Sequence, residues 1–155
     1  MNIFVALFIF LLSNFVLFWL KLNHFSEVLQ MIFFMQYMGF VAFFTQYIAE
    51  KFLNPVKSSA LIGLILGIFL QLNIPAQILQ FNVFTVAFGA TFVGMCSAKF
   101  LNGWAVFVAG CLYGLCTLFT LQNSSFIGGA MGTLACLCCL VVFNVLKIVQ
   151  WKKGI

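Results

Sequence analysis

The fold of this chain is decided by a weakly polar, glycine-broken stretch, Phe88-Gly89-Ala90-Thr91-Phe92-Val93-Gly94-Met95-Cys96-Ser97-Ala98-Lys99. It carries no charge before its terminal lysine, and small residues recur in it at Ala90, Gly94 and Ala98. In lipid, helices associate through close backbone approach rather than hydrophobic exclusion, so such a stripe is typical of a packed membrane span. The stretch therefore predicts a tightly packed transmembrane helix, and apolar runs of similar character extend from Ser58 to Leu146.

The composition of the whole chain favours a bilayer. Of its 155 residues, 65% are hydrophobic and 6% are charged, whereas a soluble domain carries about a quarter of its residues as charged ones. The charged residues are Glu27, Glu50 and seven lysines, which stand singly at the ends of apolar runs. We therefore interpret the net charge of +5 as a topology signal and not as a nucleic-acid-binding surface.

Apolar runs predict an all-α integral membrane protein with six transmembrane helices in a single domain covering residues 1–155. Trp19 and Lys21 stand where a signal peptide would have its small-residue cleavage site, so the first run is interpreted as a retained helix. Pro55 ends the second run. The expected spans are 3–20, 28–49, 58–73, 76–98, 104–120 and 125–146, followed by a short basic tail at 147–155.

The lysines also predict an orientation. With the N-terminus in the cytoplasm, the inner loops and tail hold six of the seven lysines and the outer loops hold Lys21 alone. The positive-inside rule then places both termini in the cytoplasm, and we expect a bacterial cytoplasmic membrane. Taken alone, the first helix would favour the reverse insertion, because its lysine follows its far end.

Small residues at three- and four-residue spacing occur in each of the last four spans and predict a glycine-seamed core of helices three to six. The first two spans lack such a stripe, since Gly39 is isolated, so we expect them to face lipid or to form an oligomer interface. The glycines expected at packing seams are Gly63, Gly67, Gly110, Gly114, Gly128 and Gly132.

The sequence offers little catalytic or metal-binding chemistry. The middles of the expected spans hold no charged side chain, although such residues usually mark proton relays and ion-coupled pumps. The six cysteines lie inside apolar runs, and we interpret them as small hydrophobic residues rather than metal ligands. His24 and Glu27 are interpreted as loop residues. We expect neither an enzyme nor a bound metal or cofactor.

Neutral polar residues indicate a possible solute path along the fourth span. Asn82, Thr85 and Gly89 share one helix face, either as the wall of a path or for interhelical hydrogen bonding. A match between Ser59–Gly67 and Ser124–Gly132 fits the inverted repeats of transporters, or a coincidence of two G-x-x-x-G helices. The expected path residues are Asn82, Thr85, Gly89, Thr91 and Gly94.

The sequence is compatible with two functions. One is a small multi-pass membrane protein of permease type that moves a small neutral or apolar solute, because nothing in the spans could neutralise a charged one. The alternative is a non-transporting accessory or scaffold subunit of a membrane complex, whose glycines dock partner helices. The expected partners are the lipid bilayer and a second copy or a partner membrane subunit, and not nucleic acid.

Overall fold

The computed structural model describes residues 27–73, 79–96, 99–121 and 129–152. Within these ranges the chain is all-helical, with five helices and no strand. The span expected at residues 3–20 lies outside the described residues. The helices are α2 (Glu27–Lys51), α3 (Pro55–Asn73), α4 (Leu79–Gly94), α5 (Gly103–Leu121) and α6 (Gly129–Lys152).

Two of these helices, α5 and α6, are long and apolar enough to cross a membrane. Shorter apolar segments run over Pro55–Ile68 and Thr85–Gly94. Only 17% of the apolar segment of α6 is buried against the rest of the protein, compared with 39% for α5. The exposed apolar surface of α6 is therefore available to lipid or to another helix.

The observed ends of α3 and α4 differ from the expected span limits, and residues at those ends explain the differences. Proline is favoured in the first turn of a helix, so α3 begins at Pro55 rather than at Ser58. The N–H of Ser58 donates to the carbonyl of Asn54 at 3.0 Å, which closes the first turn. The helix α4 ends at Gly94 instead of residue 98. Beyond it, the N–H of Cys96 donates to the carbonyl of Val93, three residues back, in a tighter turn than that of an α-helix.

The C-terminal helix is longer than expected. We expected the sixth span to end at residue 146 and a basic tail to follow, but α6 continues to Lys152. The residues that follow Leu146 include no glycine or proline before the helix ends. Lys152, in the last turn, also interacts favourably with the negative end of the helix dipole.

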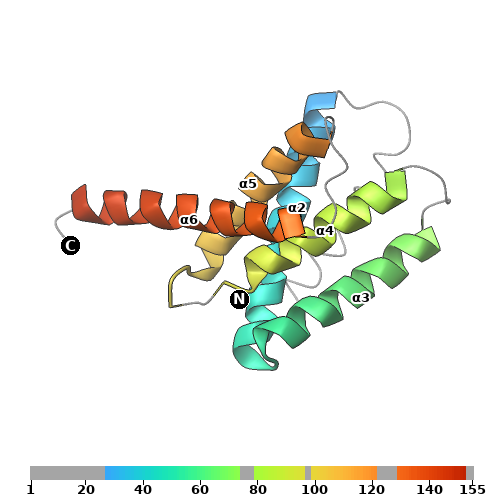
Figure 1. Ribbon diagram of the computed structural model, residues 1–155, viewed down its shortest axis with the longest axis horizontal. Helices are drawn as coiled ribbons and strands as arrows, with labels where there is room; N and C mark the ends of the chain where they lie inside the picture. The colour runs from blue at the N-terminus through green and yellow to red at the C-terminus, as the bar shows by residue number, and fades with distance from the viewer. Residues whose placement is uncertain (1–26, 74–78, 97–98, 122–128, 153–155) are drawn as a thin grey trace.

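Figure 1 shows two antiparallel helix pairs crossed by a fifth helix. In the first pair, α2 and α5 run antiparallel, since Gly103 lies near Phe43 and Gly110 lies near Gly39. In the second pair, α3 runs antiparallel to α4. The helix α6 crosses α4 and α5, and its last turns project beyond the other helices (Figure 1).

The core differs from the expected one because it includes α2, which packs against α3, α4 and α5. The side chains of Met38 and Val41 on α2 are fully buried. The expectation that the second span faces lipid is wrong, because its isolated Gly39 is itself a point of close approach to α5: an added Cβ there would lie 2.9 Å from the ring of Phe107. Gly110 of α5 lies opposite this glycine, since a Cβ placed on Gly110 would lie 2.8 Å from the Cα of Gly39.

Two polar side chains fix the connection between α4 and α5. The buried amide of Gln46 on α2 donates to the carbonyl of Leu101 at 2.8 Å and to that of Cys96 at 3.2 Å. Asn102 caps α5, since its Oδ1 accepts from the N–H of Ala105 at 3.0 Å. Side chains thus provide hydrogen bonds to backbone carbonyl and N–H groups that have none within a helix. These bonds stabilise a connection that packs against the core.

Candidate functional site

The expected path residues all lie on α4, at positions that face different neighbours. Asn82, Thr85 and Gly89 follow one another along the helix as the spacing predicts. Of these, Thr85 is half-buried and Gly89 is buried, while the side chain of Asn82 lies outside the described ones. The part of this face that the structure describes therefore centres on Gly89.

Three helices meet at Gly89. A Cβ built there would collide with the hydroxyl oxygen of Tyr113 on α5, would lie 2.8 Å from the Cζ of the same ring, and would lie 3.4 Å from the Cβ of Met131 on α6. The ring of Tyr113 therefore reaches α4 only because residue 89 has no side chain. We call this meeting point of Gly89, Tyr113 and Met131 the Gly89–Tyr113 junction.

The hydroxyl of Tyr113 is the unusual group of this junction. The residue has 0% exposure, and its hydroxyl has no hydrogen-bond partner among the described residues. Leaving a buried hydroxyl unsatisfied costs about 1–3 kcal/mol, so natural proteins rarely keep one without a use. Among the described residues, the junction therefore has one hydroxyl without a hydrogen-bond partner, and the thiol of Cys138 on α6 lies near enough to interact with it electrostatically.

Thr91 and Gly94 do not belong to this junction. The hydroxyl of Thr91 donates to the carbonyl of Phe88 at 2.6 Å and lies 2.7 Å from the hydroxyl of Ser59, which links α4 to α3. Gly94 packs against α2, where an added Cβ would meet the Cβ of Thr45 at 2.5 Å. Gly89, Thr91 and Gly94, which were expected to line one path, therefore lie on three different faces of α4.

The expected packing glycines also differ in their surroundings. Gly63 on α3 accommodates the ring of Phe88, and Gly110 and Gly114 on α5 lie against α2. Gly67 is half-buried on α3, and Gly128 lies outside the described residues. Around Gly132 no described atom lies within 4 Å of an added Cβ, so it is not a seam between the described helices.

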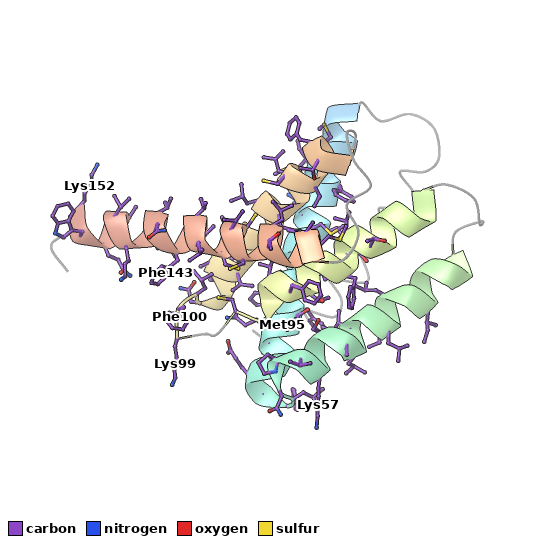
Figure 2. The ribbon with its side chains drawn as sticks, viewed as in Figure 1. Lys57, Met95, Lys99, Phe100, Phe143 and Lys152 are labelled. Carbon is purple, nitrogen blue, oxygen red and sulfur yellow. The ribbon has the colours of Figure 1, made fainter. Side chains whose placement is uncertain are left out.

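The charges stay away from the junction. Figure 2 shows Lys57, Lys99 and Lys152 pointing outward from the helices. No group of three or more potential metal-ligating His, Cys, Asp or Glu residues occurs in the described part of the chain. The charged side chains with described burial are all exposed: Glu50, Lys51, Lys57, Lys99, Lys147 and Lys152.

Sequence reasoning missed two residues that matter here. Tyr113 was not singled out, although a tyrosine inside an apolar helix carries a hydroxyl that requires either a partner or a use. The amide of Gln46 inside an apolar helix is likewise a signal that backbone carbonyls from elsewhere in the chain would meet it. In both cases the residue type indicates that a hydrogen-bond partner is needed, but the sequence does not indicate which group that partner is.

Comparison with known proteins assigns neither a family nor an activity. No protein-family model matches the chain, and searches of curated proteins and of solved structures found no match.

Proposed function

We propose that this chain is a small multi-pass membrane protein of permease type that moves a small neutral solute past the Gly89–Tyr113 junction. The observation that supports the proposal is the buried hydroxyl of Tyr113, which has no partner in the part of the chain that the structure describes and lies against a glycine of the polar face expected from the sequence. A solute hydroxyl, amide or carbonyl would satisfy that hydroxyl during passage.

The surroundings of the junction set the class of solute. Backbone at Gly89 and the side chain of Met131 border the hydroxyl, and no described charged side chain is buried. Burying an ion without a counter-charge is very costly, so a charged solute is disfavoured. A compact, uncharged molecule with at least one hydrogen-bonding group fits best.

The membrane part of the proposal combines structure with charge pattern. Two apolar helices, α5 and α6, support membrane association. We extend this to six spans with both termini in the cytoplasm of a bacterial cell, because six lysines then fall on one side. In the described state Tyr113 is fully enclosed, so movement of solute requires α6 or α5 to shift relative to α4.

The test measures solute entry into proteoliposomes that contain the full chain. Vesicles are shrunk osmotically and their reswelling is followed by light scattering with glycerol and urea as probes. Tyr113→Phe removes one oxygen from the junction, and we expect reswelling to slow about tenfold, as the loss of one hydrogen bond of about 1.4 kcal/mol implies. Equal reswelling of protein-containing and protein-free vesicles for both probes would defeat the proposal.

The matched control is Tyr47→Phe. Tyr47 is half-buried on α2, and its ring lies 4.7 Å from the ammonium nitrogen of Lys51, away from the junction. The same loss of one hydroxyl is expected to leave reswelling unchanged there. If both variants slowed entry equally, the effect would report a general loss of folding and not the junction.

The accessory or scaffold subunit is the second candidate, and the open face of α6 favours it. An added Cβ on Gly129 or Gly132 would meet none of the described residues within 4 Å, so another helix could approach this face closely. Gly132→Leu is then expected to abolish an association visible as a larger species in detergent solution. A wild-type chain that stays monomeric and purifies alone would count against this candidate.

A further inference from the structure

Two adjacent cysteines on α6 point toward two different helices. Consecutive residues of an α-helix are rotated by about 100°, so Cys138 and Cys139 cannot face the same neighbour. The side chain of Cys138 interacts with that of Cys116 on α5. The side chain of Cys139 interacts with that of Cys96, just beyond the end of α4. This part of α6 thus presents one thiol to each helix that it crosses.

Hydrogen bonds to one shared carbonyl, that of Val93, place Cys139 and Cys96 together. The thiol of Cys139 donates to the carbonyl of Val93 at 3.9 Å, and the same carbonyl accepts the N–H of Cys96 at 3.1 Å. One turn further along α6, the ring of Phe143 packs edge-on against Phe100, with 6.1 Å between centroids (Figure 2). The α6 face that carries Cys139 is therefore held against the connection between α4 and α5.

We propose that Cys96 and Cys139 form a reversible disulfide that fastens α6 to the C-terminal end of α4. In the bond-forming reaction the two thiols lose two electrons and two protons, and a small apolar disulfide takes them up and is cleaved to two thiols. The first thiol attacks the oxidant to give a mixed disulfide and releases one small thiol. The second thiol then attacks the protein sulfur of that mixed disulfide and releases the other.

The local backbone favours this pair over Cys116 and Cys138. A disulfide demands Cα atoms about 4.4–6.8 Å apart and a narrow dihedral range, so at least one backbone segment usually adjusts. Cys96 lies after the last residue of α4, Gly94, outside any regular helix, and its carbonyl is held by one side-chain donor, the amide of Gln46. Both Cys116 and Cys138 lie inside regular helices, where backbone hydrogen bonds resist such a shift.

The bridge has a consequence that rests on the proposed function. The helix that carries Cys139 also carries Met131, which covers the Gly89–Tyr113 junction. Fixing α6 to the end of α4 would hold that cover in place, so the oxidised protein is expected to pass solute more slowly than the reduced protein. Reduction would release α6 and restore passage.

The test uses membrane vesicles that contain the full chain, treated at mildly alkaline pH with dithiodipyridine, an apolar disulfide that also reaches buried thiols. Thiolate is the reacting form, which is why the pH is raised. After the remaining thiols are alkylated, chymotryptic peptides are analysed by mass spectrometry. We expect a peptide pair joined through Cys96 and Cys139, lighter by two hydrogens and separated again by dithiothreitol.

Two variants control the result. Cys96→Ser is expected to stop the reaction at the pyridyl adduct of Cys139. Cys136→Ser, which alters an exposed thiol on another face of α6, is expected to leave the bridge intact. The inference is wrong if these peptides are recovered without the bridge, or if Cys116–Cys138 is the main product.

Reswelling of oxidised and reduced proteoliposomes then tests the consequence. Slower entry after oxidation, reversed by dithiothreitol and missing in Cys96→Ser, supports the role of α6 as a cover. A bridge that forms without any change in solute entry would refute that role. A bridge in vesicles that show no protein-dependent entry at all would refute the proposed function while leaving the cysteine pair standing.

Discussion

Replacing Gly110 with alanine should separate α2 from α5, and the cost can be worked out from three contacts. The new Cβ would lie 2.8 Å from the Cα of Gly39, 2.8 Å from the carbonyl oxygen of Met38 and 2.9 Å from the Cβ of Ala42. Carbon atoms pack best at about 3.5–4.0 Å, so the helices must part by roughly half an ångström or more. All three opposing atoms belong to backbone or Cβ positions, so no rotamer change can relieve the contact.

The expected magnitude has two parts. Overpacking of this kind typically costs about 1–3 kcal/mol, while replacing glycine by alanine inside a helix gains about 1 kcal/mol. Gly132→Ala on α6 should show the gain alone, because an added Cβ there meets nothing within 4 Å. Gly114→Ala should fall between the two, since its closest contacts are 3.1 Å and 3.2 Å. The predicted order of stability is therefore Gly132→Ala, then Gly114→Ala, then Gly110→Ala.

The assay is thermal unfolding in detergent followed by far-ultraviolet circular dichroism. For a chain of this size 1 kcal/mol shifts the midpoint by roughly 2–4 °C, so Gly110→Ala should melt about 2–12 °C below Gly132→Ala. The two variants have the same chemical change and nearly the same propensity gain, so their difference isolates the contact. A Gly110→Ala protein that melts at or above the Gly132→Ala protein would refute the close packing of α2 against α5.

The same unfolding assay checks three further predictions. Gln46→Leu should destabilise the chain by about 2–4 kcal/mol, because two carbonyls in the α4–α5 connection lose their donor, whereas Gln150→Leu on the exposed part of α6 should change stability by less than about 0.5 kcal/mol. Ser59→Ala and Thr91→Val, combined in a double-mutant cycle, should show a coupling of about 0.6–1.7 kcal/mol, and a coupling near zero would mean that the two hydroxyls do not meet. Asn102→Ala should cost about 1 kcal/mol through loss of the α5 cap, while Asn102→Asp should retain most of it.

The helices were predictable from the sequence to the extent that local signals mark their ends. Proline at residue 55 separates α2 from α3, and the expected limits of α2 and α5 lie within two residues of those observed. The end of α4 was less predictable, since an apolar run continues past Gly94 while the helix does not. The last six residues of α6 were not predicted, because the lysines after residue 146 were interpreted as a basic tail. Lysines are equally compatible with the last turn of a helix.

The packing arrangement could not be predicted, because it depends on which helices meet and at what rotation. The glycine spacing indicated close approach at Gly110 and Gly114, but gave no sign that α2 was the partner. The helical spacing likewise placed Gly89 on a face with Thr85, and that part of the site followed from sequence. The contact with Tyr113 is set by the relative register of α4 and α5, which no local pattern encodes.

The substitution Tyr113→Phe distinguishes a packing role of this tyrosine from a solute-binding role. Phenylalanine would fill nearly the same volume without burying an unpartnered hydroxyl, and this chain contains 22 phenylalanines against three tyrosines. If Tyr113 served packing alone, the hydroxyl would be a liability of about 1–3 kcal/mol, and Tyr113→Phe would be neutral or stabilising with no other effect. If the hydroxyl binds solute, Tyr113→Phe should likewise be neutral or stabilising, but solute entry should be slower. Loss of stability in Tyr113→Phe would instead mean that the hydroxyl has a partner that holds the helices together, and the junction would then be a packing contact.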